Sequence, residues 1–194
     1  VPLHAQVLRA IALELERLAN HCGDLGALAG DVGFLPTAAF CGRLRGEFLN
    51  LTALLCGNRF GRSLVVPGGT RFALDAAMAE VLRRQLAVAR DELTHAVELL
   101  WVTPSVAARF ENTGTVGRET AIALGLVGPA ARACGEDRDV RVDHPLGAQP
   151  LVPVQLATAS TGDVHARALV RALEIQDSFT QLTALLDLLP PPSP

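Results

Sequence analysis

The sequence predicts a mainly α-helical protein, built as a bundle of about four long helices with a small irregular lobe that contains short helices and short strands. Two observations lead to this fold class. Four long segments carry apolar residues at the i, i+3, i+4, i+7 spacing of a helix with one buried face. Between the third and the fourth of these segments, a stretch with glycines and turn signals lacks the long helical periodicity. Antiparallel helices joined by short connections bury such faces well, so a bundle is expected.

The first long segment, from about Val7 to Val32, is expected to form a helix with three different faces. Successive helical residues turn by about 100°, which separates an apolar face from a face of small residues and a face of ionisable residues. Each interior glycine costs about 1 kcal/mol relative to alanine, so a closely packed neighbour is expected on the small face. The ionisable face is either solvated or partly buried. The apolar face holds Val7, Ile11, Leu15, Leu18, Cys22 and Leu25, the small face Ala12, Ala19, Gly23, Gly26, Gly30 and Gly33, and the ionisable face Glu14, Arg17, His21, Asp24 and Asp31.

Two more helices and an extended segment are expected in the first half of the chain. A helix over about 38–55 ends at Gly57, a common C-terminal stop. The segment 59–69 is short, β-branched in its middle and closed by a Pro-Gly-Gly turn, which is typical of an extended segment ending in a tight turn. Asp75 is expected to cap a third helix that runs to about residue 101.

The irregular lobe is expected to contain a short helix over 118–124, a single-turn helix over 129–133 and a short strand over 140–142, followed by a turn. Asp163 then caps the last long helix, 164–189. The apolar seam of this helix is predicted to be Leu169, Leu173, Phe179, Leu182 and Leu186. The chain thus divides into a helical bundle core (1–103), a loop-rich α+β lobe (104–161), a final bundle helix (162–189) and a proline-rich tail (190–194), all within one compact domain.

Composition argues against two classes of protein. Of 194 residues, 49% are hydrophobic and 19% are charged, and the formal net charge is −3. The chain therefore offers no excess of basic residues for the phosphate backbone of nucleic acid, and we expect no nucleic-acid partner. No apolar stretch reaches the ~18 residues that suggest a membrane span, and no signal-peptide layout is present at the N-terminus. Because the chain starts at Val1 and ends in prolines, we expect a fragment of a longer protein.

The four cysteines are predicted to be buried free thiols of a reducing compartment. Cys22, Cys41, Cys56 and Cys134 include no C-x-x-C pair, and no histidine stands at zinc-finger spacing. Cys22 lies on the apolar face of the first helix. A metal cage built from these four residues is not expected.

Five strings, taken together in their order and spacing, resemble the middle of a known family. They are LELERLANHCGDLGALAGDVGF (13–34), GNRFGRSLVVPGG (57–69), GLVGPAARACG (125–135), DVRVDHPLG (139–147) and GDVHARALVRALEI (162–175). Together they resemble the large subunit of membrane-bound energy-converting nickel–iron hydrogenases, especially the formate hydrogenlyase (hydrogenase III) type. The same family includes the quinone-site large subunit of respiratory complex I.

The resemblance covers only the central part of that family and implies an oxidoreductase. In these hydrogenases two cysteine pairs hold the nickel–iron centre, one before this region and one after it, and neither pair lies in this sequence. Soft thiolates are the ligands that such a centre requires. We therefore expect no cofactor on this fragment and no activity of the fragment alone. For the intact protein the resemblance implies reversible proton reduction to hydrogen, with electrons from an iron–sulfur cluster in a small partner subunit.

Two departures from the complex I pattern favour the hydrogenase branch. In complex I relatives the string at Arg59 and Phe60 is followed by a histidine close to the terminal iron–sulfur cluster, whereas here Gly61 occupies that place and Arg62 follows. Those relatives also usually carry tyrosines around the D-V-R string, and this sequence contains no tyrosine. The alternatives are a complex I type NADH-quinone oxidoreductase subunit and a non-catalytic paralogue that retains the scaffold.

The resemblance also suggests candidate site residues, beginning with a proton relay. Asp31 in the D-V-G string matches a position that the relatives keep acidic on the proton-coupling side of the active site. A carboxylate in a low-dielectric setting has a raised pKa unless it is paired, which suits proton transfer, and His21 on the same helix face is its expected partner. The competing interpretation is that both are hydrogen-bonded core residues.

A second set of polar residues is predicted to face a cluster or a subunit interface. Arg59 and Arg62 could tune a nearby iron–sulfur cluster through charge and hydrogen bonds, or form structural ion pairs. The lobe contributes a polar group that either lines an interface or satisfies the backbone of a turn. Its members are Arg132, Asp139, Arg141, Asp143 and His144.

The resemblance implies a position and partners as well. The partners would be the iron–sulfur small subunit and other subunits of a membrane-bound complex, with this protein peripheral on the cytoplasmic side of the inner membrane. A large subunit of this kind buries one broad face against its partner, so the isolated chain is expected to expose apolar surface and to self-associate.

Overall fold

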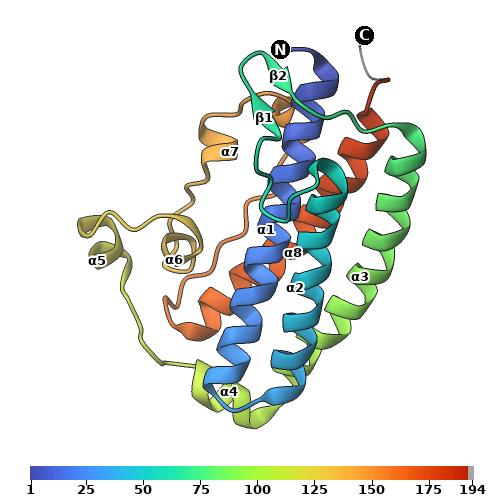
Figure 1. Ribbon diagram of the computed structural model, residues 1–194. Helices are drawn as coiled ribbons and strands as arrows, with labels where there is room; N and C mark the ends of the chain where they lie inside the picture. Colours follow the sequence, from blue (N-terminus) through green and yellow to red (C-terminus); the bar gives the residue numbers. More distant parts are fainter. Residues whose placement is uncertain (192–194) are drawn as a thin grey trace.

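The computed structural model describes residues 1–191, and four long helices form the body of that part of the chain (Figure 1). These helices are α1 (Leu3–Asp31), α2 (Leu35–Cys56), α3 (Ala76–Val102) and α8 (Val164–Leu188). α1 packs along α2 on one side and along α8 on another, while α3 packs on α2 and α8. The predicted helical bundle with a small irregular lobe is confirmed.

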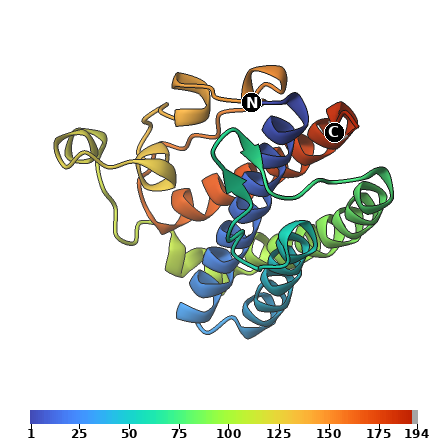
Figure 2. The same ribbon diagram turned by 45° about the horizontal axis from the view of Figure 1, so that its top comes forward.

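The short elements lie at two places around this bundle. After α2 the chain forms a hairpin of β1 (Val65–Val66) and β2 (Gly69–Thr70), in which Val65 pairs with Thr70. Between α3 and α8 it forms the lobe. Figure 1 shows α4 at the lower end of the bundle, and Figures 1 and 2 show α5, α6 and α7 on one side of it, with α5 farthest out. The lobe elements are α4 (Pro104–Phe110), α5 (Arg118–Ala123), α6 (Gly128–Arg132), α7 (Val140–Asp143) and a 3₁₀ turn (Gln149–Leu151).

Three predicted boundaries or elements need correction. α2 begins at Leu35 instead of residue 38, because Pro36 falls in the first helical turn, where its missing N–H is not needed. The strand predicted over 140–142 is wrong. Asp139 caps a helical turn there, its Oδ1 accepting a hydrogen bond from the Arg141 amide at 2.9 Å. The helix α4 was not predicted, because Pro104 was interpreted as the end of the preceding helix, whereas it occupies the first turn of α4.

The apolar face predicted for α1 is confirmed, and the small face is confirmed at Gly23 and Gly26, whereas Gly30 is exposed and Gly33 lies beyond the end of the helix. Its apolar face is completely buried in the main core. On its small face, a Cβ added at Gly26 would lie 2.8 Å from the Cβ of Cys41 in α2, and one added at Gly23 would meet Arg45 at the same distance. The glycines therefore allow α1 and α2 to approach closely, as membrane helices do at small residues.

The apolar seam predicted for α8 holds only in the second half of that helix. Phe179, Leu182 and Leu186 are buried, but Leu173 is 38% exposed. The buried face in the first half carries small apolar residues instead, and the polar residues that meet the ionisable face of α1 begin at Glu174 in the middle of the helix.

The segment that follows α8 returns to the start of α1 (Figure 1). His4 Nδ1 donates to the carbonyl oxygen of Pro190 at 2.7 Å. The last three residues of the predicted proline-rich tail, 192–194, lie outside the described residues. Over the part of the chain that is described, no helix has both the length and the apolar character needed to cross a membrane.

Candidate functional site

The ionisable face of α1 meets polar residues of α8 and of the lobe in a buried ion network. Charged side chains from α1, α8 and the lobe thus form ion pairs with one another inside the protein. The network consists of Glu14, Arg17 and His21 from α1, Arg132 from α6, Asp139 and Arg141 from the start of α7, and Glu174, Asp177 and Ser178 from α8.

Glu174 is the centre of one half of this network and is 1% exposed. Its Oε2 lies 2.7 Å from His21 Nε2 and 3.3 Å from Arg17 Nη1, and its Oε1 accepts from Arg132 Nε at 2.7 Å. An ionised carboxylate can only accept, so His21 Nε2 carries a hydrogen. Burial by itself would raise the pKa of Glu174, but the His21 hydrogen bond and the charge of Arg132 outweigh it and hold that pKa below its ordinary value.

Arg141 is the centre of the other half. Its Nε and Nη2 form a forked contact with the two Asp139 oxygens at 3.1 and 2.9 Å. Its Nη1 lies 3.2 Å from Glu14 Oε1 and 3.5 Å from Asp177 Oδ2. Burial would lower the pKa of Arg141, yet the surrounding carboxylates raise it above its ordinary value. Asp139 responds in the opposite sense: the Arg141 hydrogen bonds overcome burial and lower the Asp139 pKa.

Three buried polar atoms of the network have no hydrogen-bond partner. They are Nε of Arg17, Nδ1 of His21 and Oδ2 of Asp177. Burial raises the pKa of Asp177, and the hydrogen bond from Gln155 and the charge of Arg141 oppose this without cancelling it. By contrast, both oxygens of Glu14 are engaged, since Ser178 Oγ donates to Oε2 at 2.7 Å.

The structure brings together only part of the predicted site. His21, Arg132, Asp139 and Arg141 are buried in the network, whereas the other predicted residues are not. Asp31, Arg59, Arg62, Asp143 and His144 are exposed. Sequence reasoning missed Glu174 and Asp177, although the polar residues at 174, 177, 178 and 181 repeat with helical spacing and so mark a polar face on α8.

The expected pairing of His21 with Asp31 is wrong. The two residues are ten positions apart on one straight helix, which separates them by about 15 Å along its axis. His21 pairs with Glu174 instead, and Asp31 ends α1 with an exposed side chain. Any role of these two residues in proton transfer is therefore one that they perform separately.

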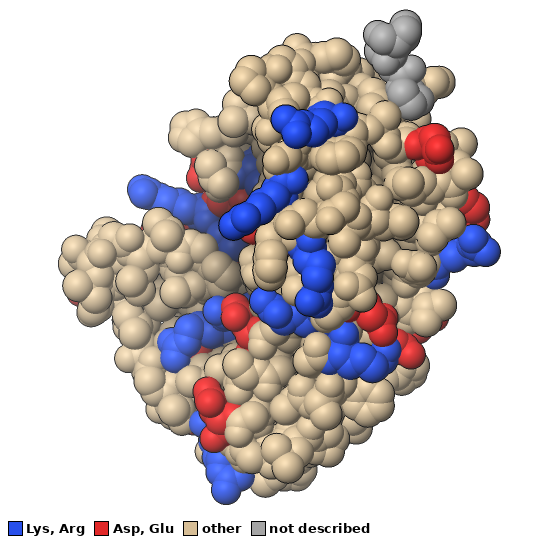
Figure 3. All heavy atoms as spheres, in the orientation of Figure 1, with Lys and Arg blue, Asp and Glu red and all other residues tan. Residues whose placement is uncertain are grey.

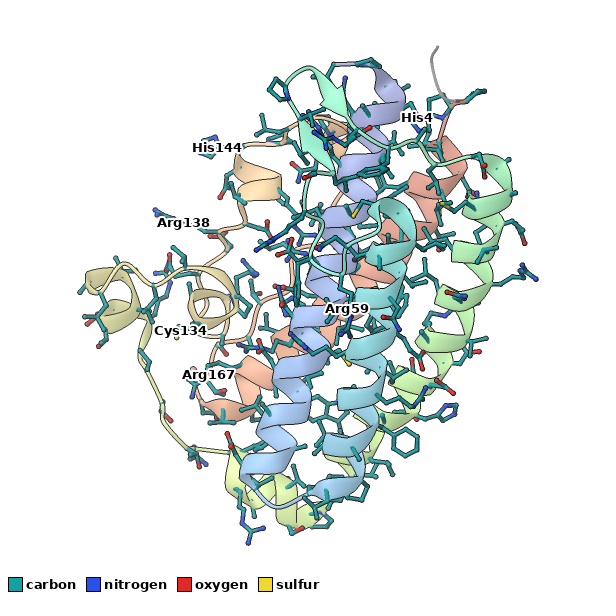
Figure 4. The ribbon with its side chains drawn as sticks, viewed as in Figure 1. His4, Arg59, Cys134, Arg138, His144 and Arg167 are labelled. Carbon is teal, nitrogen blue, oxygen red and sulfur yellow. The ribbon has the colours of Figure 1, made fainter. Side chains whose placement is uncertain are left out.

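Arg59 lies on the opposite side of α1 from the network, beside a cavity of about 260 Å³ between α1, α2 and the loop that follows α2. Arg9 and Arg45 also line this cavity, with Glu16 as its acidic residue. Figure 3 shows basic side chains gathered on this face, and Figure 4 places Arg59 in front of α2. In the same view, His144 projects from the lobe away from the bundle.

The cysteines do not fit a thiolate-bound metal centre. Three of the thiols donate hydrogen bonds to backbone carbonyl oxygens: Cys22 to Cys41 at 3.3 Å, Cys56 to Thr52 at 3.4 Å and Cys134 to Ala130 at 3.2 Å. All four thiols are free and buried, as predicted. Among residues 1–191, no three histidine, cysteine, aspartate or glutamate side chains gather so as to hold a metal ion.

Comparisons with known proteins give the chain a family. Residues 31–193 match the family described as "Respiratory-chain NADH dehydrogenase, 49 Kd subunit". Over 98% of its length the chain is 33% identical to an NADH-quinone oxidoreductase subunit of Chloroherpeton thalassium, covering 43% of that protein. It is also 33% identical, over 98% of its length, to formate hydrogenlyase subunit 5 of Escherichia coli, covering 33% of it.

A solved structure shares the whole fold. It is the membrane-bound sulfane sulfur reductase, an archaeal respiratory membrane complex, one chain of which superposes with a TM-score of 0.92 at 27% identity. The match covers 100% of this chain and 52% of that one, so the chain spans between a third and about half of the relatives it matches. The chain belongs to the family of the 49-kDa subunit of respiratory-chain NADH dehydrogenase, which also includes hydrogenase large subunits.

Proposed function

We propose that this chain is the central part of the large subunit of a nickel–iron hydrogenase of the formate hydrogenlyase type. The family membership and the matches to formate hydrogenlyase subunit 5 and to the membrane-bound hydrogenase subunit alpha of Pyrococcus furiosus support it. A nickel–iron centre, held by cysteine pairs outside this chain, would supply reversible proton reduction in the intact protein. The electrons would come from an iron–sulfur cluster in a small partner subunit.

The observation that carries the choice of branch is Gly61. In complex I relatives this place is expected to hold a histidine next to the terminal cluster. Here it holds a glycine with a φ of +67°, a left-handed conformation that favours glycine. Its amide donates to the Asn58 carbonyl oxygen at 3.2 Å, and its own carbonyl accepts from the Leu64 amide at 3.1 Å. The loop is thus built around a residue with no titratable side chain.

In this proposal the buried ion network is the scaffold that holds the lobe on the bundle. Asp31 and His21 remain proton-relay candidates, acting at separate places. Arg59 and Arg62 are exposed, so their charge would be available to a neighbouring subunit and its cluster. Asp143 and His144, also exposed, suit a subunit interface. The intact protein would lie peripherally on the cytoplasmic side of the inner membrane, within a complex.

The alternative functions each have an observation in their favour. The family description and the match to the NADH-quinone oxidoreductase of Chloroherpeton thalassium favour a complex I type protein. The third alternative is the non-catalytic paralogue, and the superposition on a chain of a sulfane sulfur reductase supports it only in that the same scaffold occurs in a complex that is not named as a hydrogenase.

The test uses the intact protein purified with its partner subunits. Its nickel content, hydrogen evolution from a reduced viologen dye and quinone reduction are measured side by side. The proposal predicts bound nickel and hydrogen evolution without quinone reduction. Quinone reduction without nickel would establish the complex I alternative, and the absence of nickel and of both activities would favour the paralogue.

A further inference from the structure

Two carboxyl groups of the buried ion network converge on a single nitrogen atom. Glu14 Oε1 lies 3.2 Å and Asp177 Oδ2 3.5 Å from Nη1 of Arg141. The three residues come from α1, α8 and α7, and each is less than a tenth exposed. Two buried carboxylates that share one cation repel each other, and such pairs tend to keep one proton.

The two carboxyl groups differ in their hydrogen bonds. Each oxygen of Glu14 has a donor, Arg141 at one and Ser178 at the other. Asp177 accepts only through Oδ1, from the Gln155 amide at 3.2 Å and Gln181 Nε2 at 3.4 Å. Its Oδ2 is buried without a hydrogen-bond partner. An ionised group with an unsatisfied oxygen is costly to bury, so Asp177 is the better place for a proton.

The charges of the whole network lead to the same residue. Three guanidinium groups face four carboxyl groups, so one bound proton makes the charges equal. His21 is the other group that could take it, but a proton on its unpartnered Nδ1 would create a buried cation, whereas a proton on the unpartnered Oδ2 of Asp177 makes that group neutral. The guanidinium groups are Arg17, Arg132 and Arg141, and the carboxyl groups Glu14, Asp139, Glu174 and Asp177.

We propose that Asp177 is an internal proton-binding site, with a proton on Oδ2 at neutral pH while the other three carboxyl groups of the network are ionised. Burial and the charge of Glu14 both raise the pKa of Asp177, in agreement with this assignment. Loss of the proton to solvent turns the 3.5 Å contact with Arg141 into a full ion pair between α8 and α7. The protonation state of Asp177 therefore affects the strength of the contact between the lobe and the bundle. This link does not depend on which redox reaction the intact protein performs.

The first test is infrared spectroscopy of the full chain at neutral pH. A protonated carboxyl group has a carbonyl stretch that ionised carboxylates lack. We expect this band in the wild type, a shift of the band on labelling with ¹³C-aspartate, and its loss in Asp177→Asn. Asp24→Asn is the matched control, because the half-exposed Asp24 pairs with Arg171 outside the network, so the band should persist. A wild type without the band overturns the proposal, and so does a band that is lost only in Glu14→Gln.

Denaturation across a range of pH gives a second measurement. A group whose pKa is raised by folding contributes stability that is present below its unfolded pKa and is lost as pH rises through the folded pKa. The wild type should therefore lose stability relative to Asp177→Asn from mildly acidic to mildly alkaline pH. Parallel stability profiles of the two proteins would mean that Asp177 is ionised throughout, which contradicts the proposal. If Asp177→Asn does not fold, the labelled wild-type spectrum still shows whether an aspartate carries the proton, and a band that does not shift on labelling overturns the proposal.

Discussion

Replacing Glu174 by glutamine should strongly destabilise the chain. The amide keeps the size of the side chain but removes the charge that Arg17, His21 and Arg132 contact. Arg132, which is 3% exposed, would keep only Asp139, at 3.7 Å, as an anionic partner. Removing one member of a buried ion pair typically costs about 3–5 kcal/mol. We expect urea denaturation at neutral pH to show a loss of that size, a large share of the roughly 5–15 kcal/mol that stabilises a typical domain.

Two further variants show whether burial causes this loss. Asp24→Asn breaks an ion pair with Arg171 between the same two helices, but the aspartate side chain is 51% exposed, so the loss should be at most about 1 kcal/mol. Adding Arg132→Met to Glu174→Gln removes the stranded charge and should recover part of the stability. A loss for Glu174→Gln no larger than that for Asp24→Asn would refute the reasoning.

The same residue predicts a pH dependence. Folding lowers the pKa of Glu174 from its ordinary value of 4.5. Its contribution to stability is therefore present above that value and is lost as the pH falls through the folded pKa. The difference in unfolding free energy between the wild type and Glu174→Gln should shrink in acid, and a constant difference would contradict the assignment of Glu174 as ionised.

Three other predictions concern different parts of the molecule. Gly26→Ala places a Cβ 2.8 Å from the Cys41 Cβ and should cost about 1–2 kcal/mol in denaturant unfolding, since overpacking exceeds the gain in helix propensity. Gly30→Ala, whose nearest neighbour would be 4.0 Å away, should instead stabilise by up to about 1 kcal/mol, and equal effects would disprove the close contact. Asp31→Asn in the intact complex should slow hydrogen evolution if Asp31 relays protons, and an unchanged rate would exclude that role. Because large apolar side chains such as Phe60 are exposed, the isolated chain should scatter light as a dimer or larger species, whereas a monomer would count against a broad partner-binding face.

The sequence was informative wherever local periodicity decides the structure. The three faces of α1 follow from its own residues, because the rotation of a helix fixes which side chains share a side. Asp75 and Asp163 could likewise be recognised as caps, and each accepts the expected amide, of Met78 and Ala166. The prediction failed over 140–142, where the β-branched residues favour a strand but the cap at Asp139 stabilises a helical turn.

The partners of the ionisable face of α1 could be found only in the tertiary structure. His21 and Glu174 stand 153 positions apart, and no local pattern links two such residues. The sequence by itself determined that α1 carries apolar, small and ionisable faces. Tertiary packing decided that Glu14 and His21 of the ionisable face are buried while Asp24 and Asp31 are exposed, and that Asp177 is left with an unpaired oxygen. The physical reason is that a charge is buried only where other elements supply opposite charges, and their positions depend on how the whole chain packs.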